Sequence, residues 1–201
     1  MEFIALITWY SMYQNQSLIL FESELIILNY RLLERSELAL LGEIDRKEIV
    51  NEVYYFRDNK LEIVNEFYNI EGWDLKELHE YIDRLKDIYG RNGTIYGAFD
   101  NKTLVGLGAL ESKFIGRNND QLKLDMLYIS NNYRKKGIGK NLVNLLSKKA
   151  KELNAKSMYI SATPFRNTVE FYFAIGAKLT NEINKDLYKL EPYDIHMVLQ
   201  L

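Results

Sequence analysis

Apolar and polar residues alternate along this chain with two periods, one typical of strands and one typical of helices. A period of two between turn residues predicts strands at residues 26–33, 50–57, 61–68, 94–99, 104–110, 122–130, 157–163, 178–180 and 194–201. A period near 3.6 predicts helices at residues 36–44, 75–90, 138–153 and 167–174. Asp74 and Asn167 are expected to cap the second and fourth helices, and Gly90 to end the second.

The order of these segments indicates the fold class. The turn sequences Asp58-Asn59-Lys60 and Asp100-Asn101-Lys102 each separate two strands, which predicts two hairpins. Strands and helices alternate in the middle of the chain. We therefore expect an α/β fold of the mixed α+β kind, with one mostly antiparallel, twisted sheet and helices on both faces.

Composition indicates a single domain. The 201 residues are 47% hydrophobic and 27% charged, which is enough for a substantial core, and two prolines and eleven glycines leave no long linker. We expect one domain at residues 26–201. Residues 1–25 contain no Lys or Arg, and polar residues interrupt their apolar run at 14–16. We interpret them as an N-terminal extension of uncertain order, neither a secretory signal nor a membrane span, on a cytoplasmic protein.

Absent residue types exclude several kinds of site. The chain has no cysteine, so disulfides, thiolate metal sites and a cysteine nucleophile are excluded. The two histidines, His79 and His196, are expected to lie on a helix surface and on a terminal strand, and no metal is expected. The net charge of −2 argues against a nucleic-acid-binding protein.

The most informative segment is Arg134-Lys-Lys-Gly-Ile-Gly139, which lies between a predicted strand and a predicted helix. Gly137 and Gly139 allow the backbone to approach a ligand closely, so that free N–H groups at the helix start can bind an anion such as a pyrophosphate. The segment lacks the pattern of a nucleoside-triphosphate loop and is one glycine short of a dinucleotide loop, which weakens the ATP and NAD interpretations.

This segment resembles the acyl-CoA loop of the GNAT superfamily of N-acyltransferases, Gln/Arg-x-x-Gly-x-Gly/Ala. Residues 124–130 (LDMLYIS) and 158–162 (MYISA) resemble the family's fourth and fifth strands, and residues 167–177 (NTVEFYFAIGA) its Asn…Tyr-x-x-x-Gly helix and turn. Ala177 stands where the family most often has an aromatic residue. The resemblance implies that the fourth and fifth strands are parallel and splay apart, and that the cofactor's pantetheine arm enters the gap.

The resemblance also implies roles for individual residues. Tyr172 would protonate the departing CoA thiolate, and backbone groups of Leu127, Tyr128 and Ile129 would bind the pantetheine and polarise the thioester carbonyl. Residues implied to contact the rest of the cofactor are Arg134, Lys135, Lys136, Gly137, Ile138, Gly139, Lys140 and Asn167. We take Asp125, which strand alternation places on the same side as Leu127 and Ile129, as the candidate general base. Glu111 and a water chain are the alternatives.

Charge is unevenly distributed along the chain. Acidic residues outnumber basic ones two to one between Glu37 and Asp87. Basic residues dominate the segment after the predicted fourth strand, namely Arg134, Lys135, Lys136, Lys140, Lys148, Lys149, Lys151 and Lys156, against Glu152 alone. This pattern favours an anionic cofactor at the basic segment and a cationic acceptor at the acidic one, although two solvated faces of opposite charge would give the same pattern.

Together these features predict an acetyl-CoA-dependent N-acetyltransferase that acts on a primary amine by direct attack, because no cysteine can carry the acyl group. The alternatives are a non-catalytic acyl-CoA-binding or regulatory module on the same fold, and a nucleotide-phosphate binder. The acceptor, a small molecule or a peptide, is not identified by any motif. Neither a nucleic-acid nor a membrane partner is expected, and the oligomeric state is open, with a homodimer among the options.

Overall fold

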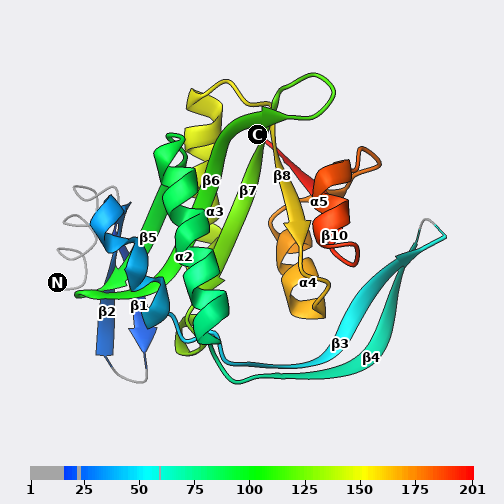
Figure 1. Cartoon of the computed structure of the whole chain (residues 1–201). Helices are drawn as coiled ribbons and strands as arrows, with labels where there is room; N and C mark the ends of the chain where they lie inside the picture. The colour runs from blue at the N-terminus through cyan, green and yellow to red at the C-terminus, as the bar shows by residue number, and fades with distance from the viewer. Residues whose placement is uncertain (1–15, 22–23, 59) are drawn as a thin grey trace, which may run out of the picture.

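The computed structural model describes residues 16–21, 24–58 and 60–201, which form an eight-stranded sheet and a separate two-stranded arm (Figure 1). The strand order in the sheet is β1-β2-β5-β6-β7-β8-β10-β9. Within the described ranges all neighbours are antiparallel except β7 and β8, so the predicted mixed, mostly antiparallel sheet is confirmed. The strands are β1 (Gln16–Phe21), β2 (Glu24–Leu32), β5 (Thr94–Asp100), β6 (Thr103–Ile115), β7 (Gln121–Ile129), β8 (Ser157–Ala162), β9 (Lys178–Leu179) and β10 (Ile195–Gln200).

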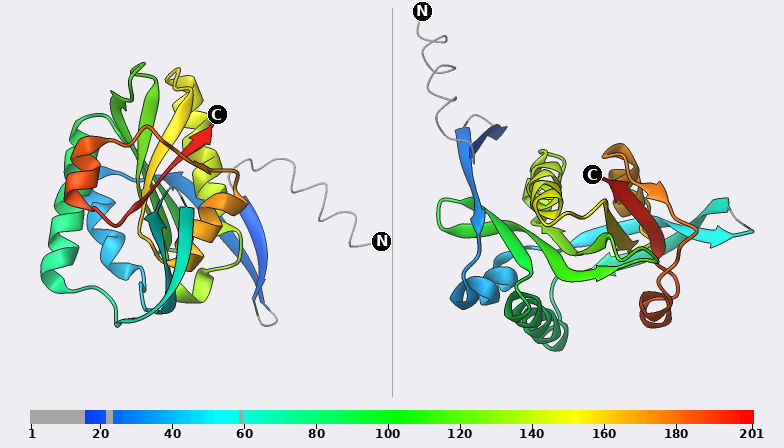
Figure 2. Two further views of the ribbon diagram at one scale, coloured as in Figure 1. Left: turned by 90° about the vertical axis from the view of Figure 1, so that its right-hand side faces the viewer. Right: turned by 90° about the horizontal axis from the view of Figure 1, so that it is seen from above.

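Helices cover both faces of the sheet, as predicted. Viewed from above, α3 (Ile138–Glu152) and α4 (Arg166–Ala174) lie on one side (Figure 2). The 3₁₀ helix η2 (Arg35–Glu43), α2 (Leu75–Gly90) and α5 (Lys185–Leu190) lie on the other. A short 3₁₀ turn, η3 (Asn131–Tyr133), connects β7 to the start of α3.

Helix α2 shows how local sequence sets an element. Asp74 is its N-cap, and one carboxylate oxygen accepts hydrogen bonds from the amides of Lys76 and Glu77 at 2.9 and 3.1 Å. The helix ends at Gly90, as predicted. Its apolar stripe is buried against the sheet through Ile82, Leu85 and Ile88.

Three features differ from the sequence-based expectations. Residues 16–21, assigned to the extension, form β1, which pairs with β2 from Gln16↔Asn29 to Phe21↔Glu24, while residues 1–15 lie outside the described ranges. Helix α5 was not predicted. Helix α4 begins one residue early, at Arg166, so its N-cap is Phe165 and Asn167 does not cap it.

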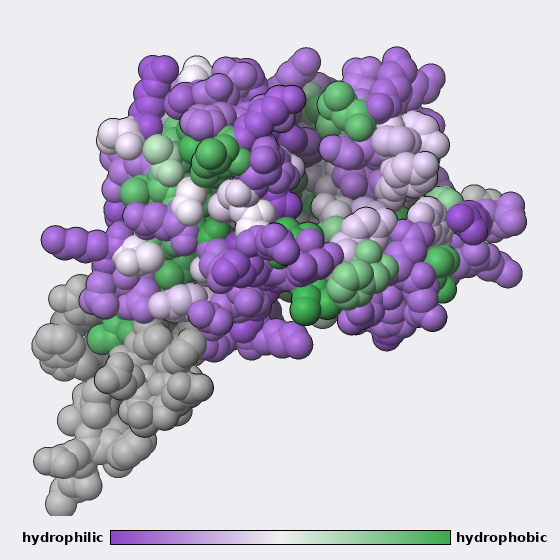
Figure 3. All heavy atoms as spheres, turned by 60° about the horizontal axis from the view of Figure 1, so that its bottom comes forward, coloured by the Kyte–Doolittle hydropathy of each residue, from purple (hydrophilic) through white to green (hydrophobic). Residues whose placement is uncertain are grey.

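The predicted first hairpin is a long arm made of β3 (Glu48–Arg57) and β4 (Lys60–Ile70). The arm contacts the main body where β8 leads into α4: the Tyr54 amide donates to the Pro164 carbonyl at 2.7 Å, and Val53 forms a β-bridge with Phe165. Hydrophobic side chains of the arm such as Ile49 and Phe67 are largely exposed. On the face shown in Figure 3, hydrophilic residues predominate and hydrophobic ones lie in separate patches.

The core lies on both faces of the sheet. On the α3/α4 face, Leu146 and Val169 pack against Ile160 and Leu124, among others. On the α2 face, Leu85 and Ile88 pack with Leu41 and Leu107, among others. Leu124 and Ile160, the last paired residues of β7 and β8, both lie in the α3/α4 layer, so this layer spans the point where the two strands separate.

Gly93, between α2 and β5, packs too closely for any side chain. A Cβ there would lie 2.8 Å from the Ile88 carbonyl oxygen and 2.9 Å from the Leu110 carbonyl oxygen, both rigid backbone atoms. We expect Gly93→Ala to lower the free energy of unfolding by about 1–3 kcal/mol, measured by urea denaturation. Gly90→Ala is the matched control, because nothing lies within 4 Å of its Cβ. Equal stability of the two variants would contradict this packing.

Candidate functional site

Strands β7 and β8 pair along only part of their length. Their parallel register runs from Gln121↔Ser157 to Leu124↔Ile160 and stops there. Beyond Leu124 the other edge of β7 still pairs with β6, up to Gly106↔Ile129. The main chain of residues 125–129 therefore faces β8 across a gap without a strand partner, which confirms the predicted splay.

A β-bulge interrupts β7 at Asp125. Leu124 pairs with Leu110 and Met126 with Ala109, so Asp125 is the extra residue. The bulge reverses the alternation of sides, and Leu127 and Ile129 pack on the α3 face with Ile138 and Leu142. Asp125 instead points to the α2 face, where it contacts Arg84. The expectation that Asp125 shares a side with Leu127 and Ile129 is therefore wrong.

The loop before α3 has the geometry of an anion cradle. Gly137 is the N-cap of α3 with φ 81°, and Lys135 also has a positive φ of 60°. Among the described residues, the amides of Lys135, Gly137, Ile138, Gly139 and Lys140 donate to no acceptor. No atom lies within 4 Å of a Cβ built on Gly137, so the cradle is open on that side. Free amides at the positive end of a helix dipole favour a bound anion.

Gly139 has a different role from Gly137. A Cβ at this position would lie 3.2 Å from the Phe171 ring and 3.8 Å from Ile129. The small residue therefore lets the first turn of α3 pack closely against α4 and β7. This packing holds the amide cradle next to the gap between β7 and β8.

The loop and α4 are tied together by an acidic residue of the arm. Glu48 forms an ion pair with Arg134 at 3.0 Å through one carboxylate oxygen and accepts a hydrogen bond from the Asn167 amide through the other. Arg134 also donates to the Ile129 carbonyl at 3.1 Å, and its own amide donates to the Asn131 carbonyl at 3.2 Å. Arg134 thus holds the loop in place, whereas the exposed Lys135 and Lys140 side chains provide cationic groups around the cradle.

Tyr172 lies on α4 in the apolar layer beside the gap. Its side chain is 7% exposed, and its ring contacts Phe171 edge to face at 5.2 Å between centroids. Burial raises the pKa of Tyr172, and the nearby charge of Asp194 raises it further. The raised pKa keeps the hydroxyl protonated at neutral pH, and because it forms no hydrogen bond with the described residues, its proton is available to a ligand.

The two carboxylates considered as bases are both held in ion pairs. Asp125 lies 2.7 Å from both Arg84 and Lys123; burial opposes its charge, yet these two cations lower its pKa below the ordinary value. Glu111 pairs with Arg91 at 2.7 Å. A carboxylate stabilised in its charged form takes up a proton weakly, so the geometry argues against Asp125 as the base.

A model of the Acetyltransferase (GNAT) family matches residues 58–176, which is more than half of the chain. The chain belongs to the GNAT acetyltransferase family. Membership agrees with the splayed strands and with the amide cradle at the start of α3. A search of curated proteins gives no sequence match.

Solved structures share the GNAT fold over most of this chain. A nourseothricin acetyltransferase is 14% identical with a TM-score of 0.66, covering 86% of this chain and 98% of its own. A putative streptothricin acetyltransferase from Bacillus anthracis, in complex with acetyl coenzyme A, is 23% identical with a TM-score of 0.63 and coverages of 87% and 98%. The PaiA N-acetyltransferase from Thermoplasma acidophilum, in complex with coenzyme A, is 18% identical with a TM-score of 0.58 and coverages of 87% and 99%. At these identities the likeness establishes the fold.

Two further sequence-predicted site residues have side chains engaged elsewhere. The Lys136 ammonium donates to the Asn132 carbonyl at 2.7 Å, and the Tyr128 side chain points away from the gap. Its ring packs against Trp73 and Tyr81 on the α2 face, with centroids 5.1 and 5.8 Å apart, and burial raises its pKa well above the ordinary value. Only its main chain faces β8. His79, expected on a helix surface, is exposed there, and its ring contacts the Leu75 carbonyl oxygen.

Sequence reasoning missed Asp194 and Ser161 near the GNAT gap, whereas His196 lies on the terminal strand β10, as predicted. Asp194 accepts a hydrogen bond from Ser161 at 2.8 Å, and Ser161 comes directly after the last β8 residue paired with β7. His196 is buried beside Tyr159, with 2.8 Å between its Nδ1 and the hydroxyl. The alternation of Asp194 and His196 with apolar Ile195 and Met197 was the available signal, because it puts both polar side chains on one face of β10.

None of the helices in residues 16–21, 24–58 and 60–201 is long and apolar enough to cross a membrane. No group of three or more His, Asp or Glu side chains in the same ranges is arranged to hold a metal ion.

Proposed function

We propose that this GNAT protein transfers an acetyl group from acetyl-CoA to a primary amine. The observation that carries the proposal is the set of unpaired amides at residues 135 and 137–140, placed directly beside the gap between β7 and β8. A coenzyme A molecule has a doubly charged diphosphate for the cradle and an amide-rich pantetheine arm for an unpaired strand edge. The solved streptothricin acetyltransferase and PaiA complexes, which contain acetyl-CoA and CoA, support this choice of co-substrate.

In the proposed complex, the diphosphate accepts hydrogen bonds from the amides of Gly137 to Lys140, and Lys135 and Lys140 add attraction that weakens with salt. The pantetheine arm pairs with the β7 main chain at residues 127–129. An N–H group of the same stretch polarises the thioester carbonyl as negative charge develops on its oxygen. The Asn167 side-chain amide donates to Glu48, and we propose that this residue borders the pantetheine.

The reaction we propose is a direct attack. The amine nitrogen adds to the thioester carbonyl carbon, the carbon–sulfur bond breaks, and the sulfur leaves with the electron pair and takes the proton of the Tyr172 hydroxyl. Burial raises the pKa of Tyr172, but it also raises the pKa of the thiol, ordinarily about 8.5, because both anions lose hydration in the same apolar layer. The chain has no cysteine to form a thioester intermediate, which favours direct attack.

A coupled thiol-release assay with a panel of amines tests the proposal. Acetyl-CoA is offered with aromatic monoamines, polyamines, a streptothricin, amino acids and a peptide amino terminus, and free CoA thiol is measured against time. We expect acetyl-CoA to bind in calorimetry much more tightly than ATP or NAD, and at least one amine to release thiol. Tight acetyl-CoA binding with no turnover on any amine would favour the non-catalytic module, and preference for ATP or NAD would favour a nucleotide binder.

A further inference from the structure

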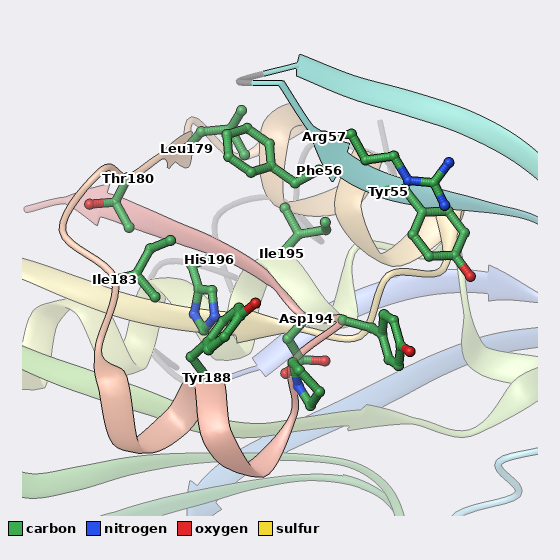
Figure 4. Close-up of a pocket in the computed structure, with 12 residues that line it drawn as sticks. Tyr55, Phe56, Arg57, Leu179, Thr180, Ile183, Tyr188, Asp194, Ile195 and His196 are labelled. Carbon is green, nitrogen blue, oxygen red and sulfur yellow. The ribbon is translucent and has the colours of Figure 1, made fainter.

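A cavity of about 440 Å³ opens between the arm, α5 and β10 (Figure 4). One of its lining residues, Tyr188, belongs to α5, and α5 lies on the face of the sheet opposite to α3 and α4 (Figure 2). Much of its wall is aromatic, and the rings come from three separate segments of the chain: Tyr55, Phe56, Tyr188 and Tyr193. A concave, largely apolar wall with few polar groups is typical of a small-molecule site.

Among the described residues, two with a formal charge line this cavity. Asp194 lies below Ile195 in Figure 4, and Arg57 lies on the arm, with its guanidinium 4.5 Å from the centroid of the Tyr55 ring. The cavity therefore offers one carboxylate and is flanked by one cation. This balance suits a ligand with a single positive charge and disfavours a polycation.

Asp194 connects the cavity to the gap between β7 and β8. Its carboxylate accepts a hydrogen bond from the Ser161 hydroxyl, and Ser161 follows Ile160, the last β8 residue that pairs with β7. Its charge also reaches Tyr172 on the opposite face, since it raises the pKa of that tyrosine. A group bound at Asp194 would thus lie at the sheet opening, with the Tyr172 hydroxyl on the other side.

His196 also lines this cavity. It is 6% exposed, and its Nε2 is buried without a hydrogen-bond partner among the described residues. The Tyr159 hydroxyl accepts a hydrogen bond from the Asn184 amide at 2.9 Å, so we infer that it donates its own proton in a hydrogen bond to His196 Nδ1. In the neutral ring the proton is then on Nε2. Burial lowers the pKa of His196, which keeps this ring neutral. With His196 neutral, Asp194 and Arg57 are the charged groups that the described residues contribute to the cavity wall.

We propose that this cavity binds the acceptor, a small monocationic primary amine with an apolar or aromatic body. Asp194 pairs with the ammonium group of the acceptor and takes a proton from it. The proposal rests on the acetyl transfer proposed above. A primary ammonium with a pKa of about 10.4 must lose a proton before it can attack. Asp194 takes that proton, the free amine attacks the thioester carbon, and the thiolate takes the Tyr172 proton. The proton left on the new amide nitrogen then returns to the Tyr172 oxygen.

Asp194→Asn tests the assignment. The variant keeps a side-chain oxygen for Ser161 but has no charge, and we expect kcat/KM for phenethylamine to fall at least 100-fold while the Kd for acetyl-CoA stays within twofold. Asp186→Asn, an exposed acidic residue in the first turn of α5, is the matched control and should retain wild-type kinetics. Wild-type enzyme should prefer phenethylamine over spermidine at least tenfold in kcat/KM.

The outcomes separate the two proposals. Wild-type turnover by Asp194→Asn, or a preference for spermidine, would overturn the assignment of the cavity while leaving acetyl transfer intact. Failure of the wild-type protein to bind acetyl-CoA would instead overturn the proposed function, and the acceptor assignment with it. Circular dichroism and acetyl-CoA binding of Asp194→Asn show that the variant is folded.

Discussion

Gly137→Glu is expected to raise the Kd for acetyl-CoA at least 100-fold, measured by calorimetry, and so to remove detectable turnover at micromolar cofactor. The glycine is the N-cap of α3, and nothing lies within 4 Å of a Cβ built on it, so the new side chain would extend into the cradle. There its carboxylate would compete for the free amides and repel the diphosphate. The positive φ of 81° adds a strain of about 1–2 kcal/mol.

A neutral variant separates charge from strain. Asn tolerates the left-handed conformation better than other residues with a side chain, so Gly137→Asn should weaken acetyl-CoA binding less than tenfold. Both variants should retain the circular dichroism spectrum of the wild type, because the loop makes no core contact at this position. A Gly137→Glu protein that binds acetyl-CoA within threefold of the wild type would show that the diphosphate lies elsewhere.

Tyr172→Phe is expected to lower kcat by about 10² to 10⁴-fold, the usual contribution of a positioned acid. The change removes a hydroxyl and keeps the ring in its apolar layer, so the Kd for acetyl-CoA should stay within twofold. Since this hydroxyl forms no hydrogen bond with the described residues, the free energy of unfolding should change by less than about 1 kcal/mol. Steady-state thiol release and urea denaturation measure the two effects.

Tyr96→Phe is the matched control for this substitution. Tyr96 is a half-buried tyrosine on β5, which β6 separates from β7 in the sheet. Its phenylalanine variant should have wild-type kcat. If Tyr172→Phe had wild-type kcat as well, the departing thiolate would take its proton from another source, such as water.

The elements set by local residues could be predicted from the sequence. Helix α2 follows from the Asp74 cap, its apolar stripe and Gly90, and the amide cradle follows from two glycines between a strand and a helix. The short α5 was not predicted, since none of its residues is buried. Its main local signal is the N-cap Asn184, whose side-chain oxygen accepts hydrogen bonds from the amides of Asp186 and Leu187. A helix without an apolar stripe has no periodic pattern to detect.

The parts of the site that depend on tertiary contacts could not be predicted. A single bulge residue reversed the side on which Asp125 points, and simple strand alternation contains no sign of a bulge. Glu48 lies 86 residues before Arg134 and 119 before Asn167, yet it joins them. Asp194, Ser161 and the aromatic arm meet only because β10 lies next to β8 and the arm folds back against the start of α4.

A crystal structure of the protein with coenzyme A would locate the cofactor. We predict that the diphosphate oxygens lie within hydrogen-bond distance of the Gly137 to Lys140 amides, and that the pantetheine runs along residues 127–129 of β7 with its sulfur near the Tyr172 hydroxyl. A diphosphate bound away from the start of α3, or a pantetheine arm outside the gap between β7 and β8, would contradict this prediction.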